Sequence, residues 1–313
     1  MSEKYSGDID RMRASDNRGH GAPAEGNGVK VFSESENGTL SKRRLLVGLD
    51  LFCLFVASLP FLACELKVVY PYQQGFFCGD PSISYPLLQR ELIPDGLLVA
   101  GGILITGLTI AVGECYRVRF RGVPSRAFVR NLYVSCLYKE LGSFLFGCAV
   151  SQSLTNVAKL SVGRLRPHFL QACGVTYGAL NCTLGTYVTK VTCKDPQLEE
   201  EARKSFFSGH ASFAMYTMLY LALYLQARWC WRGARLLRPL LQAGLLTLAL
   251  YTGLSRISDY RHHPTDVLTG LLQGALTAYW VACHVSTMFK NAKCGPSPKL
   301  LLERPLSNQH SVC

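Results

Sequence analysis

Six long apolar runs constrain this chain more than any other feature of its sequence. They cover residues 45–63, 97–112, 137–158, 211–227, 240–254 and 267–288. Hydrophobic residues make up 49% of the 313 positions and charged residues only 17%, so polar surface is too scarce to cover six such helices in water. Several runs are shorter than the roughly 20 residues of a typical span, and flanking residues must complete them. We therefore predict an all-α polytopic membrane protein with six transmembrane helices.

The sequence predicts a chain of three parts, with the six apolar runs in the middle part. Residues 1–42 are rich in Gly, Ser, Asn, Glu and Lys, and this composition predicts a disordered cytoplasmic tail because it has little apolar surface to bury. The six-span domain is predicted to cover residues 43–290, and a second cytoplasmic tail covers 291–313. The first apolar run follows a long polar segment and lacks a clear small-residue cleavage site. We interpret it as a permanent span and not as a signal peptide.

Basic residues gather in the connections that six spans would place on one side of the membrane. They are Lys42, Arg43 and Arg44, then Arg117, Arg119, Arg121, Arg126 and Arg130, and finally Arg228, Arg232, Arg235 and Arg238. Because basic connections face the cytoplasm, both termini are predicted to be cytoplasmic. Topology signals and contact with anionic lipid then explain the formal net charge of +12, and no nucleic-acid partner is predicted.

The connection at residues 160–208 falls on the opposite, exoplasmic face, where Asn181 begins a glycosylation sequon. Four cysteines are predicted on this face, namely Cys78, Cys173, Cys182 and Cys193. An even set permits two disulfides in an oxidising compartment, but the sequence leaves their pairing open. It also leaves open whether Cys230 or Cys294 is acylated. No Cys-x-x-Cys or His-x-x-x-His cluster occurs in the sequence, and no metal site is predicted.

The polar stretch between the fifth and sixth runs contains the residue types of a catalytic site. Pro264 suits the first position of a helix, which makes His263 the N-cap and places Asp266 in the first turn. Asp266 is then expected to accept a hydrogen bond from one ring nitrogen of His262, which leaves the other nitrogen basic and free to attack. Arg256 can supply a planar fork of donors for an oxyanion such as phosphate.

Two further polar clusters fall on the same predicted membrane face. One contains Lys159, Arg164 and Arg166 after the third run, and the other contains Ser208, Gly209 and His210 before the fourth. Pro167 keeps the preceding Arg166 out of a helical conformation, so its guanidinium should point sideways. Ser208 is a good N-cap, and the free N–H groups of a new helix attract anions. Each cluster alone has a simpler interpretation, as cations at a membrane interface or as an ordinary helix start.

Together the three clusters match the signatures of the type 2 phosphatidate phosphatase superfamily. They read Lys-x6-Arg-Pro at 159–167, Ser-Gly-His at 208–210 and Ser-Arg-x5-His-x3-Asp at 255–266. The chain resembles the lipid phosphate phosphatases of vertebrate plasma membranes over about residues 43–290. Phe207 departs from the family pattern, since the second signature usually begins with proline, but that position contributes no catalytic group. The resemblance implies a helical bundle similar to that of haloperoxidases.

The resemblance also implies a role for each residue of the signatures. His262 would attack phosphorus and form a phosphohistidine, Asp266 would orient His262, and His210 would protonate the leaving alkoxide. The phosphate-binding residues would be Lys159, Arg166, Ser208, Gly209 and Arg256. These cations would do the work of Mg²⁺, so the resemblance implies that no metal or other cofactor is needed. The family spacing selects His262 and not the adjacent His263.

A phosphate site between helix ends at the membrane boundary suits a monoester whose tail stays in the bilayer. The expected substrates are phosphatidate, lysophosphatidate, sphingosine 1-phosphate and ceramide 1-phosphate, without a stated preference among them. The expected location is the plasma membrane, with an extracellular active site that attenuates lipid signalling. The resemblance further implies a homo-oligomer.

Three other classes of protein remain open at this stage. The first is a catalytically silent relative that binds lipid or acts as a scaffold, although every chemical position of the signatures is filled. The second is a receptor or transporter, for which charges within the spans would be expected. The third is another enzyme of the superfamily, such as a sugar phosphatase or a vanadate haloperoxidase.

Overall fold

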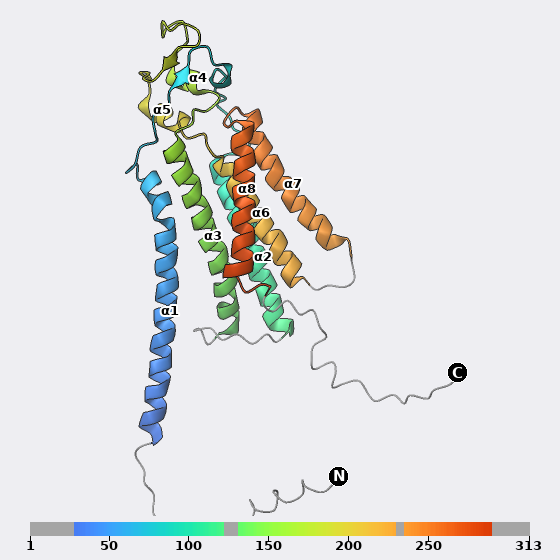
Figure 1. Ribbon diagram of the computed structural model, residues 1–313. Helices are drawn as coiled ribbons and strands as arrows, with labels where there is room; N and C mark the ends of the chain where they lie inside the picture. Colours follow the sequence, from blue (N-terminus) through green and yellow to red (C-terminus); the bar gives the residue numbers. More distant parts are fainter. Residues whose placement is uncertain (1–27, 122–130, 230–234, 290–313) are drawn as a thin grey trace, which may run out of the picture. The chain divides into compact units, whose positions relative to one another are not determined.

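The computed structural model describes residues 28–121, 131–229 and 235–289, and Figure 1 labels its elements. The long helices are α1 (Gly28–Glu65), α2 (Asp95–Arg121), α3 (Leu132–Val162), α6 (Gly209–Arg228), α7 (Leu237–Ser258) and α8 (Pro264–Trp280), which a π-helical turn, η2 (Val281–Val285), continues. Each predicted apolar run lies within one of these helices, apart from the last residues of the sixth run. The prediction of a mainly helical chain is confirmed.

Three of the long helices in the described part of the chain are long and apolar enough to cross a membrane. They are α1 over Arg44–Glu65, α2 over Asp95–Phe120 and α7 over Leu237–Ser258. Helices α3, α6 and α8 occupy the other predicted runs but bury many small and polar side chains against their neighbours. The six-span arrangement therefore stays a prediction, with three spans supported.

The first residue of helix α1 lies before the predicted start of the membrane domain at residue 43. The helix begins at Gly28, although residues up to 42 were predicted to be disordered. A helix that an apolar run has already nucleated gains one hydrogen bond for each residue it adds, so it can extend into polar sequence. Residues 1–27 of the predicted N-terminal tail lie outside the described residues. So do the predicted C-terminal tail and both candidate acylation sites, Cys230 and Cys294.

Helix α6 contacts α2, α3, α7 and α8, and it carries much of the buried core. The approach of α8 to α6 depends on Gly270 and Gly274, which lie one turn apart. A Cβ at Gly270 would lie 2.6 Å from the carbonyl oxygen of Ser208, and a Cβ at Gly274 would collide with the carbonyl oxygen of Ser212. Small residues at this spacing let two helix backbones approach closely. The contact brings the start of α8 next to the start of α6.

A buried ionic group ties the helices together at the other end of α6. Arg228 donates to Glu140 over 2.6 Å, and its Nε lies 3.6 Å from Glu114. The hydroxyl of Ser286 donates to Glu140 over 2.7 Å. These contacts join α2, α3, α6 and the segment after η2. Buried charges of this kind need such partners, because removing one partner leaves the other uncompensated.

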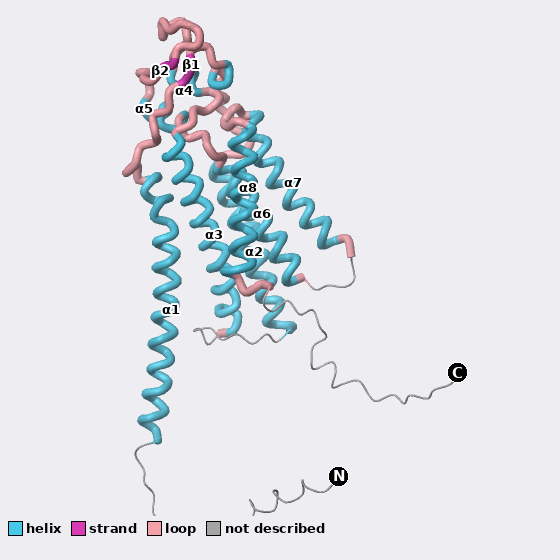
Figure 2. The backbone as a smooth tube through the Cα atoms, viewed as in Figure 1, coloured by secondary structure: helices cyan, strands magenta, loops and turns pink. Residues whose placement is uncertain are grey.

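The connections between helices form a small layer at one end of the bundle, where Figure 2 shows two short strands. Its elements are β1 (Phe76–Phe77), η1 (Pro81–Ile83), α4 (Phe169–Cys173), β2 (Tyr187–Val188) and α5 (Pro196–Ala202), and β1 pairs antiparallel with β2. Disulfides join Cys78 to Cys182 and Cys173 to Cys193. The predicted set of four cysteines is thus confirmed, and its pairing is resolved. Asn181 lies exposed in the same layer.

Candidate active site

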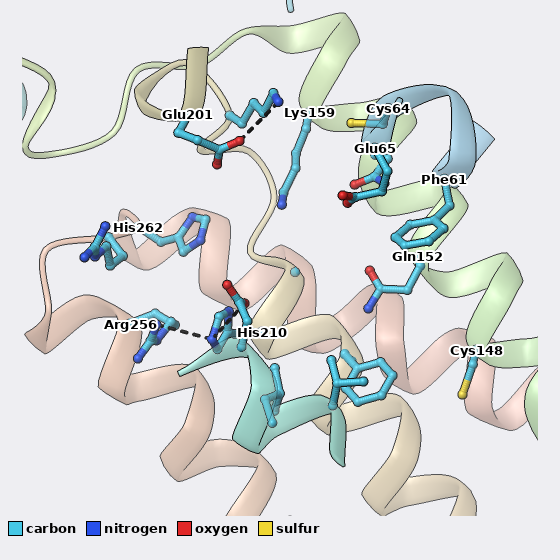
Figure 3. Close-up of a pocket in the computed structure, with 18 of the residues that line it drawn as sticks. Phe61, Cys64, Glu65, Cys148, Gln152, Lys159, Glu201, His210, Arg256 and His262 are labelled. Carbon is cyan, nitrogen blue, oxygen red and sulfur yellow. Dashed lines mark hydrogen bonds and ion pairs between the residues drawn. The ribbon is translucent and has the colours of Figure 1, made fainter. Parts of the chain in front are cut away.

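A cavity of about 970 Å³ opens at the end of the bundle next to this layer. It is lined by residues of α1, α2, α3, α5, α6 and α7 and by the connections before α2, after α3, after α5 and before α8. The residues of the three sequence clusters that line it are Lys159, Arg166, Gly209, His210, Arg256 and His262. In Figure 3 the labelled side chains of Lys159, His210 and His262 surround the same space. The fold therefore brings the three clusters together.

His262 lies between α7 and α8, directly before the N-cap of α8, and is 4% exposed. Its Nδ1 lies 2.7 Å from the carbonyl oxygen of Ser205. A carbonyl oxygen only accepts, so Nδ1 carries the proton and the lone pair is on Nε2. Burial, together with the positive charges of Arg166 and Lys159, holds the pKa of His262 well below its ordinary value. The ring is therefore neutral at physiological pH and has a nucleophilic nitrogen.

Asp266 does not accept the hydrogen bond from His262 that the sequence led us to expect. Ser205 Oγ donates to one of its carboxylate oxygens over 2.6 Å, and Arg164 donates to the other over 2.5 Å. The backbone N–H of His263 donates to the same oxygen as Ser205 does, over 3.2 Å. The capping geometry at the start of α8 turns the carboxylate toward these donors. Asp266 thus holds Ser205, whose carbonyl group orients His262.

The neighbouring His263 is not among the residues that line the cavity. It is the N-cap of α8, as predicted, and its Nε2 lies 3.1 Å from the carbonyl oxygen of Leu165. Pro264 is the first residue of the helix, also as predicted. Of the two adjacent histidines, the one that lines the cavity is the one that the signature spacing selects.

His210 stands in the first turn of α6, and Ser208 caps the helix as predicted. The Nε2 of His210 lies 3.1 Å from the carbonyl oxygen of Ile93, 3.3 Å from Arg256 Nη1 and 3.4 Å from Asp95 Oδ1. Two of these neighbours only accept, so Nε2 carries a proton. The contact with Arg256, drawn as a dashed line in Figure 3, is then a proximity of two donors.

The predicted phosphate ligands differ in how they meet the cavity. A Cβ at Gly209 would lie 3.4 Å from Lys159 Nζ, so the glycine leaves this amine close to the N-terminus of α6. Arg166 lies 3.5 Å from Glu201, outside any helix as Pro167 requires. The hydroxyl of Ser208 accepts from the N–H of Ala211 and is not part of the cavity lining. Its role as a direct phosphate ligand stays a prediction.

Arg256 is 1% exposed and already has two carboxylate partners. Its guanidinium donates to Glu91 and to Asp259, each over 2.8 Å. Burial raises the pKa of Glu91, but the hydrogen bond from Arg256 and the charge of Arg261 outweigh it and bring the pKa below its ordinary value. Glu91 is therefore ionised beside the cavity.

Sequence reasoning missed several charged residues of this region. Glu91, Glu201 and Lys204 line the cavity, and Arg164 pairs with Asp266 instead of marking a membrane interface. Glu201 and Lys204 lie at the end of α5, where they pair over 3.2 Å. None of these residues belongs to a signature. The signal that could have found them is the excess of acidic residues in connections that lead into a cationic site.

Comparisons with known proteins define the class of the chain. Residues 140–290 match the PAP2 superfamily, and this range contains all three sequence clusters. Phospholipid phosphatase 2 of Homo sapiens is 47% identical over 273 residues, which are 87% of this chain and 93% of the relative. Phospholipid phosphatase 1 of Rattus norvegicus is 47% identical over 256 residues, 81% of this chain and 89% of the relative. No solved structure matches the chain.

The chain belongs to the PAP2 superfamily, and its relatives place it with the lipid phosphate phosphatases. The predicted resemblance is thereby confirmed, and so is the predicted class of enzyme, a phosphatase that hydrolyses phosphomonoesters. The relatives and the apolar helices also identify a membrane protein.

Proposed function

We propose that this protein is an integral membrane phosphatase that hydrolyses lipid phosphomonoesters through a phosphohistidine on His262. One observation carries the proposal. His262 lines the cavity beside Lys159, Arg166 and His210, and its hydrogen bond to a carbonyl group leaves Nε2 unprotonated. A neutral imidazole among cations is a nucleophile placed where a phosphate dianion would bind.

The reaction would proceed in two steps. The Nε2 lone pair of His262 attacks phosphorus, the bond from phosphorus to the ester oxygen breaks, and His210 gives a proton to the departing alkoxide. Burial and the charge of Arg256 lower the pKa of His210 to about 4, so His210 must enter this step as an imidazolium that the negative charge of the bound phosphate dianion stabilises. Water then attacks the phosphohistidine and gives up a proton to His210 while the bond between phosphorus and nitrogen breaks. The products are the lipid alcohol and inorganic phosphate, and both histidines return to their starting states.

The charges around the cavity suit a phosphoryl group in transfer. Lys159, Arg166 and Arg256 line the cavity and supply positive charge, and Arg256 is almost completely buried. Electrostatic stabilisation is strongest where water is excluded. The first turn of α6 adds the backbone N–H groups of a helix N-terminus next to Gly209. We propose that these groups perform the charge stabilisation for which other phosphatases use Mg²⁺, and that the reaction is independent of that ion.

The substrate class follows from how the cavity changes along its length. It begins among the cations and continues along α3 to Ala149 and Cys148, and Ile103 of α2 also lines it. An amphiphile with a phosphate at its polar end matches this gradient. We propose phosphatidate, lysophosphatidate, sphingosine 1-phosphate and ceramide 1-phosphate as substrates. The names of the relatives, phospholipid phosphatases 1 and 2, support the lipid class.

We further propose six spans in a haloperoxidase-like bundle, cytoplasmic termini, and an active site on the extracellular face of the plasma membrane. Two disulfides and the exposed Asn181 lie in the layer next to the cavity, and both features fit an oxidising, glycosylating compartment. A site on that face would act on signalling lipids of the outer leaflet and attenuate their signals. A homo-oligomer is part of the same proposal, from resemblance alone.

Phosphate release from lysophosphatidate in detergent micelles with excess EDTA tests the proposal. We expect the wild type and His263→Ala to be active and His262→Ala to be inactive. Activity in His262→Ala would refute the nucleophile assignment. A wild type that binds lipid phosphates but hydrolyses none of them would favour the alternative, a silent relative that acts as a lipid-binding or scaffold protein.

A further inference from the structure

A band of amide side chains separates the cationic end of the cavity from its apolar end. Helix α3 lines the cavity with one face, which carries in order Cys148, Ala149, Gln152, Asn156 and Lys159. This spacing of three and four residues places the side chains in a single row along the helix. Gln152 and Asn156 therefore lie between Lys159 and the apolar part of the cavity, and Figure 3 shows Gln152 lining the same pocket as Phe61 of α1.

Asn156 is the unusual member of this row. It is 6% exposed, and its amide nitrogen is buried without a hydrogen-bond partner among the described residues. A buried amide donor is normally paired, because leaving it unpaired is unfavourable. The two ends of an amide have the same shape, so a half-turn of the group exchanges nitrogen and oxygen within the same space. Because Asn156 lines the cavity, its amide donor can meet a ligand bound there in one of these two orientations.

The distance from Lys159 indicates what would meet this donor. Three residues of helix rise separate the two positions, about 4.5 Å. In a lipid phosphomonoester, the groups that follow the phosphate at this distance are those of the polar linkage to the apolar chains. Glycerol lipids present ester carbonyl oxygens there, which accept hydrogen bonds. At the carbon that corresponds to this ester, sphingosine 1-phosphate presents an ammonium group, which only donates, and its hydroxyl group lies one carbon further along the chain.

We infer that Asn156 recognises the polar linkage of the substrate and makes the enzyme prefer lipids that present an oxygen acceptor next to the phosphate. Gln152, one turn further from Lys159, extends the same band to the next polar group of the lipid. Selection of this kind is strong when the site supplies a buried polar group, because the wrong substrate leaves that group unpaired. The inference rests on the proposed function, since it assigns a substrate preference to the same cavity.

The variant Asn156→Asp tests the inference because it keeps the shape and replaces the amide donor with a carboxylate that accepts. The measurement is kcat/KM for phosphatidate divided by kcat/KM for sphingosine 1-phosphate, in the same micelles. A general effect on phosphate binding or folding cancels in this ratio. We expect the ratio to fall at least about tenfold in Asn156→Asp, as expected when a buried donor is exchanged for an acceptor.

Asn131→Asp is the matched control. Asn131 caps the other end of α3, and aspartate caps a helix as well as asparagine does. The ratio should stay at the wild-type value in this variant. Hydrolysis of p-nitrophenyl phosphate, which has no such linkage, reports whether the phosphate machinery of each variant is intact.

The outcomes separate the inference from the proposed function. A wild type without lipid phosphatase activity would refute the proposed function itself. An active Asn156→Asp whose ratio stays within twofold of the wild type would overturn the inference alone. If Asn156→Asp also loses activity on p-nitrophenyl phosphate, Asn156→Leu decides, because it removes the amide at similar volume. Its ratio should also fall, and an unchanged ratio would overturn the inference.

Discussion

The carbonyl oxygen of Ser205 lies 2.7 Å from Nδ1 of His262, and the hydroxyl of the same serine donates to Asp266 over 2.6 Å. Ser205 is completely buried between them. The orientation of the proposed nucleophile therefore depends on a backbone group that a side-chain hydrogen bond holds in place. In the familiar arrangement of a histidine with its carboxylate, the two groups touch. Here one residue separates them.

Replacing the serine hydroxyl tests this relay. Ser205→Ala keeps the carbonyl group but removes the bond to Asp266, so we expect kcat to fall about tenfold with little change in KM, because one general orienting contact is lost. Asp266→Ala should lower kcat further, since it also leaves Arg164 without its buried partner. The double variant should be no worse than Asp266→Ala. Additive losses would show that the two residues act separately.

The pH dependence of kcat/KM should report the neutral state of His262. The neutral ring attacks, so activity is lost as the pH falls through its pKa, which burial and the charges of Arg166 and Lys159 hold well below 6.5. The acid limb of the wild-type profile should thus lie below pH 6.5. Arg166→Gln removes one of the positive charges that lower the pKa of His262. The acid limb of this variant should therefore move to higher pH, even if its maximum activity is lower than that of the wild type. A limb that stays in place would exclude this electrostatic link.

Helix packing provides a prediction about stability. In Gly274→Ala the new methyl group would meet the backbone of α6 at Ser212, so we expect unfolding in detergent at lower temperature, with a loss of about 1–3 kcal/mol. Gly244→Ala on α7 is the matched control, because nothing lies within 4 Å of its Cβ position. The control should be unchanged or slightly more stable. Equal losses in both variants would rule out the close approach of α8 to α6.

The disulfides provide a second prediction about stability. Loss of the Cys78–Cys182 bond, which closes a loop of 104 residues, should destabilise the protein by about 4–5 kcal/mol, and loss of Cys173–Cys193, which closes one of 20, by about 3 kcal/mol. Thermal unfolding of paired Cys→Ser variants measures both. Cys53→Ser, at an exposed free cysteine, should have no effect. A variant that lacks both disulfides and is as stable as the wild type would contradict this pairing.

Much of this architecture could be predicted because it depends on local patterns. Apolar runs mark helices, and the position of Pro264 correctly placed His263 at the cap of α8. The signature spacing identified His262 as the histidine that faces the cavity. Each of these inferences needs only neighbouring residues and the period of a helix.

What the sequence could not provide depends on contacts between distant segments. The hydrogen bond expected between Asp266 and His262 is replaced by contacts to Ser205 and Arg164, which approach from another connection. Glu91 precedes α2 and belongs to no motif, yet it pairs with Arg256. The pairing of the four cysteines also depends on distant contacts, because their spacing allows several pairings and only the fold selects one.

The carboxylates around Arg256 have a consequence for the end of the catalytic cycle. Glu91 and Asp259 remain beside this guanidinium, so a bound anion must share it with two negative charges that belong to the protein. A lipid substrate is also held by its tail in the apolar part of the cavity. Inorganic phosphate has no tail, so nothing offsets the competition of Glu91 and Asp259 for Arg256. We expect the site to retain its product weakly, so that turnover in phosphate-rich fluid is limited little by product inhibition.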